Sequence, residues 1–245
     1  KEIMDHLFFI FPHEETIFNK IKLPNTYVGH PLASKIPLTP SSEKAKKILG
    51  IDWGGNIISI LPGSRKAEVR WHLNVMLKAA LIINRNLKNC IFLLPVNNKI
   101  NHDYVLKKIN AYKLKNIRVI FGHSHEVICS SDIVLLASGT ATLEAALFKK
   151  PMIIIYKMSL LSWFLLKRMH LIPYIGLPNI LLNKFAVPEL LQEEAQPEKI
   201  AHETIEILSN KKNLKDLKSD FKKLHLNLKK NTSSLIIGEV QRYLK

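Results

Sequence analysis

The sequence is poor in cysteine, and none of its apolar runs is long. Only 2 of the 245 residues are cysteines, Cys90 and Cys129, and neither has the paired spacing of a disulfide framework or a zinc site. We interpret both as buried thiols of a cytoplasmic protein. Lys157 and Lys167 bracket the strongest apolar stretch too closely for a membrane-spanning helix. Any membrane contact is therefore expected to be peripheral.

Acidic residues are also scarce, because 36 Lys and Arg face 20 Asp and Glu and leave a formal net charge of +16. Such a charge attracts nucleic acid, an anionic membrane surface or a phosphorylated substrate, and it also serves simply to keep a protein soluble. The C-terminal lysines lack interleaved aromatic residues, and no nucleic-acid motif is present, so we expect no nucleic-acid partner. The chain starts without Met or a signal-peptide pattern, which predicts that it begins within a longer protein.

The sequence does show the alternation of strand-like and helix-like segments that is typical of a packed α/β protein. Apolar runs rich in β-branched residues alternate with stretches of helical periodicity, which predicts a Rossmann-like, doubly wound parallel sheet. The predicted strands are 7–11, 57–61, 90–95, 117–121, 133–137 and 152–156, and the predicted helices are 69–87, 102–112, 140–148 and, in the tail, 198–230. A Pro- and Ser-rich linker at 37–42 divides the predicted domains into 1–36, 37–197 and a helical tail, 198–245.

Two glycine-containing loops directly follow predicted strands and precede predicted helices. Glycine lets a backbone approach an anion closely, a helix start offers unpaired N–H groups, and an arginine adds a charge-assisted contact. Ligands of parallel sheets collect outside the carboxyl ends of the strands, so both loops are expected to face one crevice and to bind a diphosphate. The candidate ligands are Gly63, Ser64 and Arg65 in the first loop and Ser138, Gly139 and Thr140 in the second.

Four further polar residues are candidates for contacts with a nucleotide sugar. Glu144 lies one helical turn beyond Thr140, where it suits a ribose diol and, equally, a glutamate that only caps the helix. Asn179, Glu189 and Gln192 lie among turn residues and suit sugar hydroxyls, but such residues are more often caps and loop anchors.

Five short runs occur together in one order: YVGHPL at 27–32, LPGSR at 61–65, ASGTATLEA at 137–145, GLPN at 176–179 and PELLQ at 188–192. Together they resemble the lipid-A-disaccharide synthase family, from near the N-terminus to about residue 205. The resemblance implies the C-terminal half of a GT-B fold. It also implies inverting transfer of 2,3-diacylglucosamine from UDP-2,3-diacylglucosamine to the 6-hydroxyl of 2,3-diacylglucosamine 1-phosphate, without metal or cofactor, in the lipopolysaccharide biosynthesis of a Gram-negative bacterium.

The same resemblance assigns roles to the candidate residues. Arg65 is expected to contact phosphate, 138–140 the diphosphate and Glu144 the ribose, with Asn179, Glu189 and Gln192 lining the donor side of the cleft. The catalytic base, an aspartate, is expected in a missing N-terminal domain or a separate chain, so no catalytic residue is assigned here and this chain alone is expected to be inactive. His30, in the hinge, is a further candidate for stabilising the leaving UDP, but a lone histidine in a loop is more often structural.

Alternatives remain at this point. They are another GT-B enzyme such as a UDP-sugar epimerase, and a split UDP-sugar-binding protein that transfers nothing by itself. The segment 158–169 joins Trp163 and leucines to adjacent cations, which favours contact with anionic lipid or acyl chains, although burial against the missing domain explains the same leucines.

Overall fold

A computed structural model describes residues 4–20, 22–159, 163 and 173–244. Most of the segment predicted to contact lipid, 158–169, therefore lies outside the described residues. Within them, no helix is both long enough and apolar enough to cross a membrane.

The centre of the molecule is a six-stranded sheet in the order β5-β4-β3-β6-β7-β8, with every neighbouring pair parallel. Its strands are β3 (Asn56–Leu61), β4 (Cys90–Val96), β5 (Ile117–Phe121), β6 (Ile133–Ala137), β7 (Met152–Tyr156) and β8 (Glu189–Leu191). The chain builds outward from β3 to one edge, returns to β6 beside β3, and then builds to the other edge. This reversal creates a crevice beyond the carboxyl ends of β3 and β6, which is where such sheets bind ligands. The predicted doubly wound sheet is confirmed.

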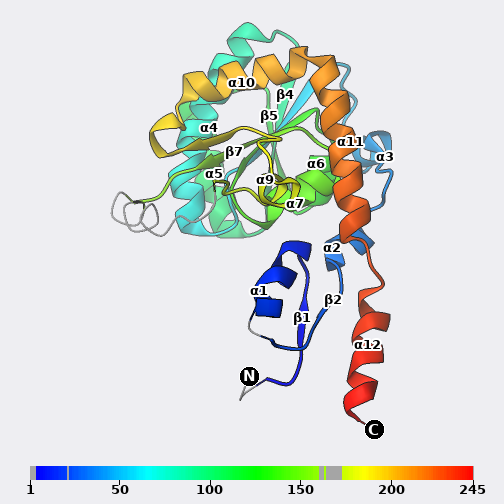
Figure 1. Cartoon of the computed structure of the whole chain (residues 1–245). Helices are drawn as coiled ribbons and strands as arrows, with labels where there is room; N and C mark the ends of the chain where they lie inside the picture. The colour runs from blue at the N-terminus through cyan, green and yellow to red at the C-terminus, as the bar shows by residue number, and fades with distance from the viewer. Residues whose placement is uncertain (1–3, 21, 160–162, 164–172, 245) are drawn as a thin grey trace.

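Helices cover both faces of the sheet (Figure 1). They are α3 (Ser42–Ile48), α4 (Lys66–Asn86), α5 (Lys99–Tyr112), α6 (Ser124–Ser130), α7 (Thr140–Leu147), α9 (Leu177–Leu182), α10 (Pro197–Ser209) and α11 (Lys211–Leu228). Successive side chains of a strand point to opposite faces, so Leu135 of β6 packs with α4 and α10, whereas Leu136 packs with α7 and α11. Because β6 is buried on both faces, all of its residues are apolar.

The N-terminal segment and the last helix form a separate, thinner part below the sheet (Figure 1). It contains β1 (Leu7–Phe9), a 3-10 turn (Pro12–Glu14), α1 (Glu15–Lys20), β2 (Asn25–Tyr27) and α12 (Thr232–Tyr243), and β1 pairs with β2 in parallel. α2 (Pro31–Lys35) connects this part to the main body, where Ala33 is buried with Leu224 and Leu228 of α11. α12 packs along this segment, because its Tyr243 hydroxyl is 3.0 Å from Nδ1 of His6, just before β1, and its Thr232 hydroxyl donates to the carbonyl of Val28, just after β2, at 2.8 Å. No residue of α1 or α12 is buried.

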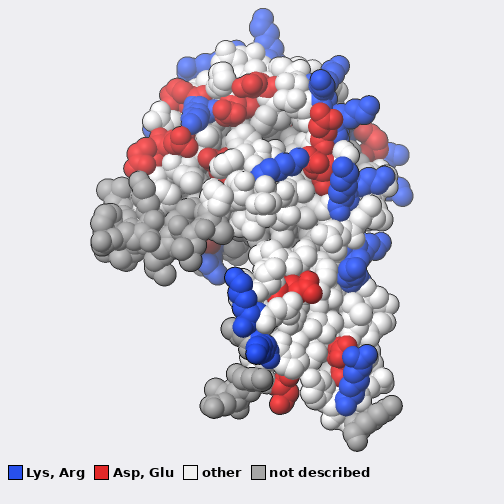
Figure 2. All heavy atoms as spheres, in the orientation of Figure 1, with Lys and Arg blue, Asp and Glu red and all other residues white. Residues whose placement is uncertain are grey.

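The predicted tail therefore divides between two parts of the molecule. α10 and α11 pack against the sheet, and α12 joins the N-terminal segment. The stretch predicted as helical from 198 to 230 is two helices, because the Asn210 side chain accepts the Asn213 N–H and starts α11 anew. On the face shown in Figure 2, acidic residues gather over α10 and basic ones over α11.

Candidate functional site

A pocket of about 590 Å³ opens at the carboxyl ends of β3, β6 and β7. The loops after these strands supply its walls, as expected at the reversal of the strand order. Seven of the ten candidate residues line it: Gly63, Ser64, Arg65, Ser138, Gly139, Thr140 and Glu144.

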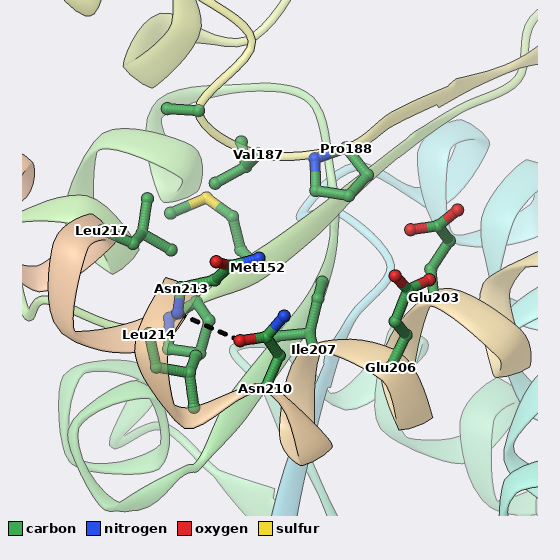
Figure 3. Close-up of a pocket in the computed structure, with 12 residues that line it drawn as sticks. Met152, Val187, Pro188, Glu203, Glu206, Ile207, Asn210, Asn213, Leu214 and Leu217 are labelled. Atoms are coloured by element: carbon green, nitrogen blue, oxygen red, sulfur yellow. Dashed lines mark hydrogen bonds between the residues drawn. The ribbon is translucent and has the colours of Figure 1, made fainter.

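A second cavity of about 230 Å³ lies at the opposite, amino ends of β7 and β8, between α10 and α11 (Figure 3). Met152, Val187 and Leu214 give it an apolar lining, and Glu203 and Glu206 lie at one side. Together with His202, these glutamates form a group able to hold a metal ion, the only such group found in the described part of the chain. None of the candidate residues lines this cavity, so the larger pocket is the candidate site.

The loop after β3 is already occupied by a carboxylate. Oε2 of Glu68 accepts hydrogen bonds from the backbone N–H groups of Ser64 at 3.0 Å and Arg65 at 3.2 Å. The Arg65 guanidinium lies 3.5 Å from the other oxygen of Glu68, and its side chain is 85% exposed. The expectation that this helix start presents unpaired N–H groups is therefore wrong for these two residues, because Glu68 closes a capping box.

His72 joins this loop to the end of β7. Its ring is 1% exposed; Nε2 accepts the Lys157 N–H at 3.0 Å, so Nδ1 carries the proton and donates to the Pro62 carbonyl at 3.1 Å. Burial lowers the pKa of His72 and keeps the ring neutral. The sequence analysis missed this residue, although its spacing from Val69 and Glu68 places it on the inner face of α4.

The loop after β6 is open. Gly139 precedes the first turn of α7, and no side chain caps that turn in the part of the chain that the structure describes. The Thr142 hydroxyl donates to the Gly139 carbonyl at 2.7 Å and so leaves the N–H groups alone. Apart from the chain neighbours of Gly139, no atom of the described residues lies within 4 Å of the position that a Cβ on Gly139 would take. This helix start has the free donors and the free space that the sequence predicted for both loops.

Glu144 lies on α7 with its side chain 20% exposed and 3.7 Å from Nε2 of His125. The hydrogen bond and charge of Glu144 raise the pKa of His125, which partly favours the imidazolium form. Among the described residues no hydrogen bond joins Glu144 to the first turn of its helix, so the capping interpretation is not what the structure shows. The carboxylate lines the pocket instead.

The three remaining candidates lie behind the pocket wall and bond to the protein itself. Glu189 accepts the N–H groups of Ile175 at 2.8 Å and Gly176 at 2.9 Å, and its Oε1 also accepts from Asn179 Nδ2 at 2.7 Å. The other amide atom of Asn179 accepts the N–H groups of residues 186 and 187, and the Gln192 amide bonds to the backbone of residue 158. Asn179 and Gln192 are buried, and none of the three lines the pocket.

One cation that the sequence analysis did not select also lines the pocket. Lys157 follows β7 directly, and its ammonium donates to the Gln192 carbonyl at 3.0 Å. Among the described residues that line the pocket, the charged ones are therefore two cations, Arg65 and Lys157, and two carboxylates, Glu68 and Glu144.

Comparison with known proteins gives matches over the whole chain. A family model described as lipid-A-disaccharide synthetase matches residues 1–240. A lipid-A-disaccharide synthase of Chromobacterium violaceum is 40% identical over 233 residues, which are 94% of this chain and 60% of that protein. One of Methylobacillus flagellatus is 37% identical over 248 residues, 100% of this chain and 65% of that protein. The chain thus spans about three fifths of the length of these relatives.

Solved structures share the fold at low identity. WaaG, a glycosyltransferase involved in lipopolysaccharide biosynthesis, aligns with a TM-score of 0.59 at 14% identity and covers 92% of this chain and 59% of its own. A UDP-GlcNAc 2-epimerase of Neisseria meningitidis, bound to UDP-GlcNAc, aligns with a TM-score of 0.58 at 13% identity, over 95% of this chain and 59% of its own. The chain has the Rossmann-like half of a GT-B fold.

Proposed function

Since the chain belongs to the lipid-A-disaccharide synthase family, we propose that it is the donor-binding part of an inverting glycosyltransferase. It binds UDP-2,3-diacylglucosamine, whose diacylglucosamine group passes to the 6-hydroxyl of 2,3-diacylglucosamine 1-phosphate. The acceptor site and the aspartate base belong, in this proposal, to the part of the relatives' length that this chain does not span.

The observation that carries the proposal is the pocket at the reversal of the strand order, with seven candidate residues in its walls. The first turn of α7 donates its N–H groups to the diphosphate, and the partial positive charge of a helix start favours the anion. Glu144 accepts hydrogen bonds from the ribose diol. When the sugar leaves, negative charge grows on UDP, and the helix start, Arg65 and Lys157 stabilise it in place.

Asn179, Glu189 and Gln192 are proposed as positioning residues. Glu189 and Asn179 hold the backbone at 175–176, whose Ile175 carbonyl accepts from the Ser138 hydroxyl at 3.5 Å. Gln192 holds residue 158, next to Lys157. They therefore act on the donor through the loops that form the rim of the pocket.

We further propose that the protein works in the cytoplasm as a peripheral protein on the anionic face of the inner membrane. The net charge of +16 favours such a surface, and both proposed substrates carry acyl chains. The proposed division of the chain, 1–36, 37–197 and 198–245, places a domain boundary at the proline-containing linker and the hinge just before it, in the YVGHPL run at 27–32.

Calorimetry tests donor binding. The chain is titrated with UDP and with UDP-2,3-diacylglucosamine, with and without a chelator, and we expect both to bind with affinities that the chelator leaves unchanged. Loss of binding on chelation contradicts the metal-free site, and failure to bind either ligand contradicts the proposal.

The reaction is tested separately by adding the acceptor and a polypeptide that completes the relatives' length, and following the disaccharide by mass spectrometry. We expect disaccharide from the combination. Since a UDP-GlcNAc 2-epimerase shares the fold, a parallel incubation with UDP-GlcNAc is inspected for its 2-epimer. Appearance of that epimer without disaccharide would favour the epimerase alternative.

A further inference from the structure

We propose that Lys149 and His225 form a clamp that fastens α2 and the linker after it to the main body, so that bending between the main body and the N-terminal segment is confined to residues 28–31 and 228–232. The main body is the six-stranded sheet with its covering helices. The inference goes beyond the proposed function and does not depend on donor binding.

Within the described residues the chain crosses between the main body and the N-terminal segment twice, from β2 to α2 and from α11 to α12 (Figure 1). The two crossings are bonded to each other. The His30 N–H donates to the Leu228 carbonyl at 2.9 Å, and the Thr232 hydroxyl donates to the Val28 carbonyl at 2.8 Å. Gly29 has a φ of +75°, and a Cβ there would lie 2.7 Å from the Leu228 carbonyl oxygen. The backbones thus approach too closely for a side chain, and the two crossings form one joint.

The side chain of Lys149, just beyond the end of α7, holds the main-body side of this joint. Its half-buried ammonium lies 2.6 Å from Nδ1 of His225 and donates to the carbonyls of Leu147 at 2.5 Å and Pro37 at 3.4 Å. His225 is fully buried, and its Nε2 donates to the Ala33 carbonyl of α2 at 2.8 Å. One pair of side chains therefore connects α7, α11, α2 and the linker.

The protonation states that these contacts need are those of neutral pH. Because Nε2 of His225 carries a proton, Nδ1 of the neutral ring is left to accept from Lys149. Burial lowers the pKa of His225, which keeps the ring neutral, and lowers the pKa of Lys149 to about 8, which leaves the ammonium mostly charged at pH 7. An ammonium has three N–H donors, and these three acceptors use all of them.

Burial differs on the two sides of the joint. On the main-body side, Ala33 and Ile36 are buried in one cluster with Leu228. Beyond the joint, no residue of α1 or α12 is buried, and Phe11 is only partly buried against the same cluster. Segments with few buried contacts open at a lower free energy than the core does. We therefore expect the N-terminal segment and α12 to move, and α2 to stay with the main body.

Amide hydrogen exchange of the parent chain tests to which side α2 belongs. The amides of Ile36 and Lys229 lie on the main-body side, and those of Leu7 and Leu235 lie beyond the joint, and all four donate to backbone carbonyls. We expect Ile36 and Lys229 to exchange at least about tenfold more slowly than Leu7 and Leu235. Equal or faster exchange of Ile36 and Lys229 overturns the inference, whatever the chain binds.

Variants test the cause. Lys149→Met and His225→Phe each remove two or more hydrogen bonds, so exchange at Ile36 and Lys229 should become at least about tenfold faster, while exchange in β6 and the affinity for UDP stay as in the parent chain. His225→Gln keeps one acceptor and one donor and should restore slow exchange. Lys184→Met breaks a 2.7 Å ion pair with Asp220 of the same helix, α11, and serves as the control that should change neither rate.

Unchanged exchange at Ile36 and Lys229 in both Lys149→Met and His225→Phe contradicts the clamp. If exchange in β6 becomes faster to the same degree, the variants have lost global stability, and the comparison within the parent chain decides. Failure of the parent chain to bind UDP removes the proposed function and leaves the clamp standing.

Discussion

The loops after β3 and β6 leave neighbouring strands, contain a glycine, begin a helix and line one pocket, yet among the described residues only the first has a carboxylate bonded to its backbone N–H groups. The difference lies at the third position of each helix. In α4 this residue is Glu68, which turns back and accepts two N–H groups, whereas in α7 it is Thr142, which donates to a carbonyl. A strand–glycine–helix pattern thus predicts where a ligand loop lies, and the third helical residue decides whether its donors are free.

Each loop also has its own histidine. His72 is buried and bonds to the Pro62 carbonyl in the loop after β3, and burial lowers the pKa of His72. His125 pairs with Glu144 beside the open loop, and the carboxylate raises its pKa. The two sides of the pocket are therefore expected to respond oppositely to pH.

The largest expected effect is that of His72→Phe, which removes both hydrogen bonds of the buried imidazole. Phenylalanine fills similar space but leaves the Pro62 carbonyl and the Lys157 N–H without a partner, at roughly 1 to 3 kcal/mol for each. We expect the free energy of unfolding, from urea denaturation at neutral pH, to fall by about 2 to 6 kcal/mol. The same substitution at His202, whose side chain is 73% exposed, serves as the control and should change little.

The pH dependence of the free energy of unfolding is a second test of the role of His72. Because folding lowers the pKa of His72 from 6.5, its contribution is complete above about pH 6.5 and is lost as the pH falls through the folded value. Burial also lowers the pKa values of His30 and His225. The free energy of unfolding of the His72 variant should therefore still fall toward acid pH, but less steeply than that of the parent chain. An unchanged slope between pH 7 and pH 5 would contradict the assignment.

The next-largest effect is expected from Glu144→Ala, on the side of the pocket formed by the loop after β6 and α7. Loss of a hydrogen bond to a charged group costs about 1.5 to 3 kcal/mol, so UDP should bind roughly 10- to 150-fold more weakly, whereas pyrophosphate, which lacks the ribose, should bind no more weakly than to the parent chain. Calorimetry with both ligands measures the ratio. Glu126→Ala, a nearby carboxylate outside the pocket lining, is the matched control. Equal losses for UDP and pyrophosphate would remove the ribose role.

A smaller effect is expected from Gly63→Ala, in the loop after β3. The positive φ and the contact with Glu68 should lower the free energy of unfolding by about 1 to 3 kcal/mol. Gly50→Ala, at a φ of +60° and with no atom of the described residues within 4 Å apart from its chain neighbours, gives the cost of a positive φ without a contact. If Gly63 serves Glu68, the cost should shrink in a Glu68→Gly background, which removes both the Cβ and the carboxylate that an alanine at position 63 would meet, as measured by a double-mutant cycle. Additive effects would show that the two residues are independent.

Much of the sheet could be predicted because its strands are buried on both faces. Runs such as 133–137 are apolar throughout, and this signal comes from the sequence alone. The three-residue strands β2 and β8 were not predicted, since 25–27 contains Asn and Thr and 189–191 begins with a glutamate. Those strands exist because they pair with β1 and β7, which is a tertiary effect.

The candidate site was predicted in position more than in detail. The loop residues meet in one pocket because parallel strands end at one edge of the sheet, a rule that needs only the strand order. The occupation of one loop by Glu68, the hydrogen bonds of His72 and the bonding of Glu189 to residues 175–176 depend on side-chain directions and long-range contacts. Spacing along the chain does not encode these, so polar residues with sugar-binding chemistry proved to bond to the backbone.

The smallest expected effect is that of His125→Gln, and its sign separates the two sides of the pocket. Folding raises the pKa of His125 because the ionised Glu144 favours the imidazolium, so the pair stabilises the fold below about pH 6.5 and this contribution is lost as the pH rises through the raised folded value. The pair is partly exposed at 3.7 Å, and solvent screens such pairs to about 0 to 1 kcal/mol. Urea unfolding at pH 5.5 should therefore show a loss of less than about 1 kcal/mol, and at pH 8.5 no loss. His72→Phe should show the opposite trend in its ionisation-linked part. A His125→Gln loss that grows toward high pH would mean that the neutral ring, through its contact with Phe148 at 5.4 Å between ring centroids, is what holds this side of the pocket together.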